Sequence, residues 1–93
     1  QHVSVVDVTA NRTVLDLSGP SARGVLEKAC GLDLRPRAFK PGQCAQTNLA
    51  RTVGILELGQ SGAWRIYVRN SFALYLADWL LDAMAEYAID AAL

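Results

Sequence analysis

Few side chains in this sequence have the type and spacing that catalysis requires. Acid–base and nucleophilic catalysis need titratable groups held close together, and histidine is the commonest of them. The only histidine is His2, near the start of the chain, where ends often fray. Cys30 and Cys44 are too far apart for a CxxC redox or zinc motif, and we expect both to be buried, reduced core thiols. We therefore expect no catalytic residues and no metal site on this chain.

Three carboxylates near the end of the chain share one spacing. Asp78, Asp82 and Glu86 recur every four residues, so they lie on one face of a helix. Such a row could hold a cation, but metal ligands usually converge from several elements. We interpret the row as a solvated stripe.

Two segments have groups that could bind an anion. Ser18–Ser21 lie at the start of a predicted helix, whose first N–H groups are free to bind a negative group. Arg35, Arg37 and Lys40 surround Phe39 in a loop and could bind a phosphate or an acidic surface. A solvated loop is the competing interpretation. Neither a GxGxxG nor a GxxxxGK[ST] motif is present, so the sequence offers no nucleotide cradle.

The 93 residues are enough for one domain, which we place over residues 1–93. The net charge is zero, which argues against a nucleic-acid or membrane-surface partner, and no apolar run is long enough to span a membrane. Nine Lys/Arg against five Asp/Glu give residues 1–70 a charge of +4, and four acids without a base give residues 71–93 a charge of −4. The start, at Gln1 without Met, is typical of a trimmed chain or a fragment, and the expected compartment is the cytoplasm.

The apolar spacing predicts strands and two helices in a definite order. Alternation and turn residues predict strands at 3–8, 12–18 and 44–49 and a hairpin of residues 51–58 and 63–69. Pro20 begins a helix of about ten residues, residues 31–43 form a loop, and the last helix runs from Ser71 to about Tyr87. This order predicts an α+β protein with a ferredoxin-like (split β-α-β), antiparallel-rich sheet of 4–5 strands and two helices on one face.

The last helix has more apolar surface than one sheet face covers. A surface helix needs an apolar stripe a little over 100° wide, whereas here the polar residues occupy only about 80° of the circumference. We expect part of this helix to lie against another chain, although its own loops and the first helix could also cover it. The expected partner interface consists of Phe72, Leu76, Trp79, Leu80, Leu81, Met84, Arg35 and Arg37.

Several stretches together resemble one protein family. They are NRTVLDLSGPSAR (residues 11–23), LDLRPRAF (32–39), CAQT (44–47) and VRNSFALYLADWLLDA (68–83). In order and spacing they resemble the gamma subunit of heterotetrameric sarcosine oxidase. The LSGPxAR piece also recurs in the aminomethyltransferase (glycine-cleavage T-protein) and folate-binding group, to which this subunit looks related in fold.

The resemblance implies a non-catalytic accessory subunit of an enzyme that oxidatively demethylates sarcosine to glycine. It implies that no cofactor is bound by this chain, and that FAD, FMN, NAD, tetrahydrofolate and zinc belong to the alpha, beta and delta subunits. Docking on these subunits is the leading hypothesis. A small folate- or anion-binding module, using Arg35, Arg37 or Ser18–Ser21, and a self-associating homodimer are the alternatives.

Overall fold

The computed structural model describes residues 2–92, with five strands and two helices. In chain order the elements are β1 (His2–Val8), β2 (Arg12–Ser18), α1 (Ala22–Ala29), β3 (Cys44–Leu49), β4 (Thr52–Leu58), β5 (Trp64–Arg69) and α2 (Asn70–Ala92). Every strand predicted from the alternation of apolar and polar residues is present, with bounds within a residue or so of those expected.

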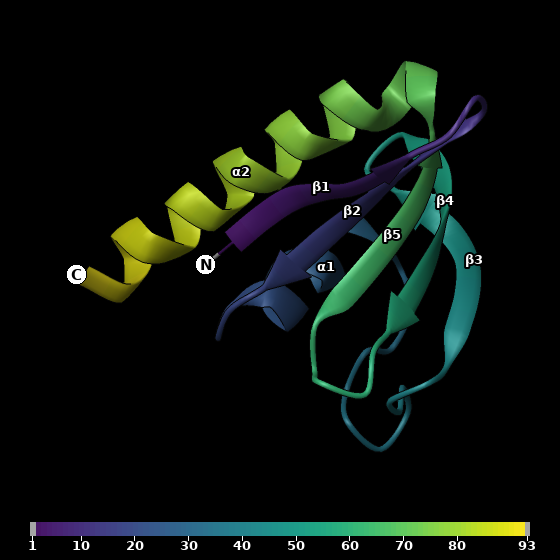
Figure 1. Cartoon of the computed structure of the whole chain (residues 1–93). Coiled ribbons are helices and arrows are strands. Elements are labelled where there is room, and N and C mark those ends of the chain that lie inside the picture. Colours follow the sequence, from purple (N-terminus) through teal and green to yellow (C-terminus); the bar gives the residue numbers. More distant parts are fainter. Residues whose placement is uncertain (1, 93) are drawn as a thin grey trace.

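The five strands form one antiparallel sheet in the order β1-β2-β5-β4-β3. Both helices pack on the same face of this sheet, and α2 runs along β1 and β2 (Figure 1). The connection from β2 through α1 to β3 is split, because β5 and β4 lie between those two strands. The expected α+β class, with an antiparallel-rich sheet and two helices on one face, is confirmed.

The core lies between the sheet and the helices. Strand residues alternate strictly between buried and less buried positions in β2, β4 and β5, because successive side chains point to opposite faces. The buried strand residues include Leu15, Leu17, Leu56, Ile66 and Val68. The opposite face of the sheet carries the polar positions and has no helix on it (Figure 1).

Helix α1 buries the side chains expected from its spacing. Ala22, Val25, Leu26 and Ala29 all face the core, as the i, i+3, i+4, i+7 pattern predicts. The helix begins at Ala22 and not at Pro20, because Gly19 has a positive φ of 120° and the Ala22 N–H donates to the Gly19 carbonyl in a preceding turn.

Helix α2 begins at Asn70, one residue before the predicted start, and extends to Ala92, beyond the predicted end near Tyr87. Its buried stripe consists of Leu76, Leu80, Ala83 and Met84. The prediction that Leu76, Leu80 and Met84 contribute to a partner interface is therefore wrong. The sheet face and α1 together cover this side of the helix, so the three side chains belong to the protein's own core.

The two cysteines differ in environment. Cys30 is buried, and its thiol donates to the Leu26 carbonyl over 3.2 Å. Cys44 is exposed at the start of β3, so the expectation that both thiols are buried is wrong for this one. Cys44 faces the helix-free side of the sheet on an edge strand, and the sequence does not show that its strand lies at the edge.

Candidate interaction surfaces

Two leucines of α2 lie outside the core. Leu74 is 75% exposed and Leu81 is 52% exposed, whereas Leu80 is fully buried. Leu81 follows Leu80 by one position, which turns it about 100° around the helix. Leu74 and Leu81 are seven residues apart, so they project from the same side of the helix.

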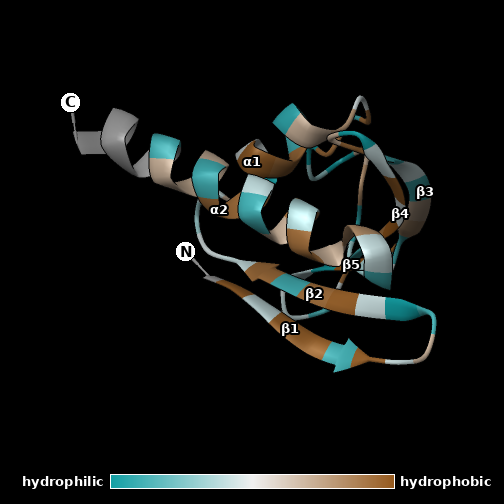
Figure 2. Ribbon diagram, turned by 90° about the horizontal axis from the view of Figure 1, so that it is seen from above, coloured by the Kyte–Doolittle hydropathy of each residue, from teal (hydrophilic) through white to brown (hydrophobic). Residues whose placement is uncertain are grey.

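The ion pair between the helices shows which side this is. Lys28 of α1 donates to Glu86 of α2 over 3.4 Å, so Glu86 marks the side of α2 that faces α1. Leu81 and Leu74 are five and twelve residues from Glu86, which turns them about 140° and about 120° around the helix, so both project away from α1. Because α2 lies between α1 and the β1–β2 ribbon, that side faces the β1 edge of the sheet (Figure 2).

Strand β1 contributes further exposed apolar side chains at this edge. Val5 stands opposite Leu15, and Val8 stands opposite Thr13, so both lie on the helix-covered face. They are nevertheless 58% and 62% exposed, because β1 is an edge strand and the helix reaches only part of it. We call Val5, Val8, Leu74 and Leu81 the apolar flank.

The other side of α2 carries three aromatic residues, of which Phe72 and Trp79 were expected at the interface and Tyr75 was not. Phe72 and Tyr75 are exposed, and Trp79 is half-buried against the core. Of the six helix residues expected at an interface, Phe72, Trp79 and Leu81 therefore retain accessible surface. Leu74, Val5 and Val8 were not among those expected. The helix spacing could have indicated Leu74, but only the sheet order places the two valines beside it.

The basic loop is partly neutralised within itself. The Arg35 guanidinium donates to both carboxylate oxygens of Asp33, over 2.9 and 2.8 Å, and the Arg35 backbone N–H donates to the same side chain. These hydrogen bonds lower the pKa of Asp33 from 3.8 to about 2 and raise the pKa of Arg35. Arg37 is exposed. Of the two arginines expected at a partner interface, Arg35 is therefore hydrogen-bonded to Asp33 within the loop, and Arg37 is accessible.

The start of α1 and the basic loop meet at a pocket of about 330 Å³. Gly19 and Pro20 line it from the first segment and Pro36 and Phe39 from the loop. Arg35 and Arg37 do not line it, so the structure does not bring together the groups proposed for an anion site. The cation at this pocket is Arg23, whose guanidinium lies 5.4 Å from the centre of the Trp64 ring.

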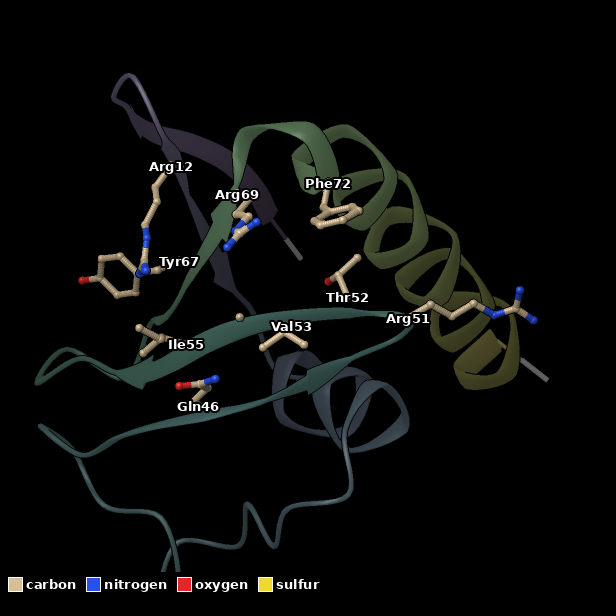
Figure 3. Close-up of a pocket in the computed structure, with 10 residues that line it drawn as sticks. Arg12, Gln46, Arg51, Thr52, Val53, Ile55, Tyr67, Arg69 and Phe72 are labelled. Atoms are coloured by element: carbon tan, nitrogen blue, oxygen red, sulfur yellow. The ribbon is translucent and has the colours of Figure 1, made fainter.

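A second pocket, of about 380 Å³, lies on the helix-free face of the sheet (Figure 3). Arg12 of β2 and Arg69 of β5 stand directly opposite each other there. Sequence reasoning missed this pair. The alternation of β2 and β5 places both residues on polar faces, but nothing local sets the register between strands more than fifty residues apart.

Within residues 3–86, no group of three or more His, Cys, Asp and Glu side chains is placed to hold a metal ion. No helix in residues 2–92 is long and apolar enough to cross a membrane.

The fold and its surfaces define a small α+β protein with accessible apolar groups on both its last helix and an edge strand. Comparison with known proteins identifies the family. The chain belongs to the sarcosine oxidase gamma subunit family, whose model matches residues 1–86.

Individual relatives agree with this membership. The sarcosine oxidase subunit gamma of Corynebacterium sp. (strain P-1) is 45% identical over 84 residues, which are 90% of this chain and 41% of the relative. The corresponding subunit of Arthrobacter sp. is 43% identical over the same share of each chain. Human mitochondrial dimethylglycine dehydrogenase is 30% identical over 92 residues, which are 95% of this chain but 10% of that protein.

A solved structure shows the same fold. Heterotetrameric sarcosine oxidase from Corynebacterium sp. U-96, in complex with pyrrole 2-carboxylate, contains a chain that matches with a TM-score of 0.80 and 43% identity. The match covers 90% of this chain and 43% of that one. The chain thus spans about two fifths of the length of the curated gamma subunits that it matches.

Proposed function

We propose that this chain acts as a non-catalytic accessory subunit that docks on the large subunits of a sarcosine oxidase, with the alpha subunit as the expected neighbour. The observation that carries the proposal is the apolar flank. A monomeric protein can expose single apolar residues without consequence, but adjacent ones on a helix and an edge strand are typical of an interaction site.

Strand β1 adds a second reason. An edge strand presents unpaired backbone N–H and C=O groups, and proteins usually protect such edges with charge, proline or a covering element. Here the central part of β1, from Val3 to Val8, contains one charged side chain, Asp7, and no proline. A partner that covers Leu74 and Leu81 would therefore lie close enough to shield this edge as well.

The catalytic work of the complex belongs, in this proposal, to the partner subunits. They would hold FAD, FMN, NAD, tetrahydrofolate and zinc, and would oxidise sarcosine to glycine. The contribution of this chain would be to stabilise the assembled enzyme.

The proposal is tested by co-expressing the tagged chain with the sarcosine oxidase subunits of the same organism and measuring what co-purifies. The combined substitution Leu74→Asp and Leu81→Asp should reduce recovery of the large subunits at least tenfold while the circular dichroism spectrum stays unchanged. Both side chains are exposed, so the fold should tolerate the charge.

A matched control adds the same kind of charge elsewhere. Ser61→Asp lies in the exposed turn between β4 and β5, at the end of β5 remote from α2, and should leave recovery unchanged. Equal recovery of the large subunits with the double variant and the wild type would exclude the apolar flank as the docking surface. A wild-type chain that recovers none of them would exclude the accessory role.

A further inference from the structure

Rows of side chains cross the helix-free face of the sheet, and they differ in charge balance. Arg65 of β5 stands opposite Asp16 on one side and Glu57 on the other. Four residues further along the same strand and on the same face, Arg69 stands opposite Arg12. Like charges directly opposite each other on neighbouring strands are destabilising. The carboxylates of Asp16 and Glu57 therefore balance the charge of Arg65, whereas the row of Arg12 and Arg69 has two positive charges side by side.

Within the described residues, the second row has no carboxylate directly opposite either arginine; the nearest by register is Asp7, which stands opposite Val14, two positions from Arg12. The ion pairs within residues 3–86 are Lys28 with Glu86 and Asp33 with Arg35, and neither involves Arg12 or Arg69. The pairing of β4 with β5 ends at Gly54 opposite Val68, so β4 places no acidic residue across from Arg69. The row of Arg12 and Arg69 is therefore open to a negative group from outside the described residues.

The surroundings of the two arginines form a shallow, mixed pocket. Tyr67 and Ile55 lie next to them on the same face, and Gln46 closes the β3 side. In Figure 3 the Arg12 side chain reaches towards Tyr67, whereas Arg51, at the rim, extends away from the pair. Val53 and Phe72 add apolar side chains to the rim, and both are exposed.

We propose that an aspartate or glutamate carboxylate of a partner subunit binds between Arg12 and Arg69. This inference rests on the proposed function, because it assigns a second contact to the same assembly. A guanidinium offers two parallel N–H donors that match the two oxygens of a carboxylate. The guanidinium groups of Arg12 and Arg69, on facing strands, can both donate hydrogen bonds to the same carboxylate.

The openness of the site favours a carboxylate carried by a protein over a free anion. Both arginines are exposed, and exposed ion pairs are weak because water screens them. A free anion would be held by these contacts alone. A carboxylate on a partner chain is held in place by neighbouring contacts as well, and the exposed Val53 and Phe72 offer apolar surface for them.

The test compares charge-matched variants in the co-expressed complex. Arg12→Gln with Arg69→Gln should weaken binding to the large subunits about tenfold and should flatten the dependence of binding on salt concentration. The control, Lys28→Gln with Arg65→Gln, removes the same charge but leaves the pair intact, and should change binding less than twofold. If the glutamine pair disturbs folding, Arg12→Lys with Arg69→Lys keeps the charge and removes the fork geometry, and should give an intermediate loss.

The outcomes separate this inference from the accessory role. If the wild type binds the large subunits and the Arg12/Arg69 variant binds equally well with the same salt dependence, this inference fails while the accessory role stands. If the wild type does not bind them, the accessory role fails. A parallel NMR titration of the chain with citrate or inorganic phosphate should show no binding below millimolar concentration. Sub-millimolar binding that is lost in the Arg12/Arg69 variant would instead assign the site to a free anion.

Discussion

The hydroxyl of Thr13 donates a hydrogen bond of 2.7 Å to the side-chain oxygen of Asn70, 57 residues later in the chain. Thr13 is buried in β2, and Asn70 is the first residue of α2. The amide nitrogen of Asn70 also donates to the carbonyls of Thr9 and Ala10 in the β1–β2 turn. One side chain thus joins the start of α2 to β2 and to the hairpin beside it, and so fixes where the helix crosses the sheet.

Asn70→Ala should therefore lower the free energy of unfolding by about 1–3 kcal/mol, because it leaves the buried Thr13 hydroxyl without its partner. Thr13→Val removes the donor instead and should cost less, since no buried polar group of that side chain remains unpaired. Urea unfolding measures both. Asn48→Ala, at an exposed position of β3, is the control and should change stability by less than about 0.5 kcal/mol. A loss at Asn70 no larger than the control's would show that these hydrogen bonds do not stabilise the fold.

The adjacent residues Leu80 and Leu81 should differ sharply in their effect on stability. Leu80 is fully buried, so Leu80→Ala should cost about 2–5 kcal/mol through lost burial and the cavity that remains. Leu81 is half exposed, and Leu81→Ala should cost less than about 1 kcal/mol. Thermal or urea unfolding of the isolated chain measures the loss of stability in each variant. Equal losses would mean that the helix is rotated from the position described above.

Most of the fold was predictable from local pattern because each element carries its own signal. Strict alternation in residues 12–18 and 64–69 determines which side chains of β2 and β5 are buried, and Gly19 and Pro20 separate β2 from the start of α1 at Ala22. The extent of burial on α2 was not predictable in this way. Its surface is apolar almost all round, so the sequence alone could not distinguish Leu80, which the sheet covers, from Leu81, which it does not.

The candidate surfaces were even less predictable from the sequence, because they bring together residues that are far apart in the chain. The apolar flank combines Leu74 and Leu81 with valines of β1, and these lie on one side of the protein only because β1 is the edge strand beside α2. Arg12 and Arg69 became a pair through the register of β2 against β5. Register depends on the packing of whole faces, which is a property of the complete sheet.

The hydrogen bonds between Arg35 and Asp33 predict a definite acid titration. Because they lower the pKa of Asp33 from 3.8 to about 2, their contribution is complete above about pH 4 and is lost as the pH falls through about 2. In Arg35→Gln the pKa of Asp33 should return towards 3.8, whereas in Arg37→Gln it should stay low, because Arg37 acts only through its more distant charge. Carboxyl ¹³C NMR follows this titration directly. An unchanged pKa in Arg35→Gln would show that the loop contact does not persist in solution.

Gly54 of β4 should not tolerate a side chain, because neighbouring atoms leave no room for a Cβ. A Cβ at this position would stand 3.0 Å from the Tyr67 carbonyl oxygen on β5 and 3.2 Å from a methyl group of Leu49 on β3. The carbonyl belongs to the sheet ladder and cannot move without disturbing the pairing of Gly54 with Val68. Gly54→Ala should therefore lower the free energy of unfolding by about 1–3 kcal/mol, as overpacking in a core does. Gly31→Ala is the control, because a Cβ there meets no atom within 4 Å, and its effect should be small. If Gly54→Ala were as stable as Gly31→Ala, β4 and β5 would have to lie further apart at this point than the structure places them.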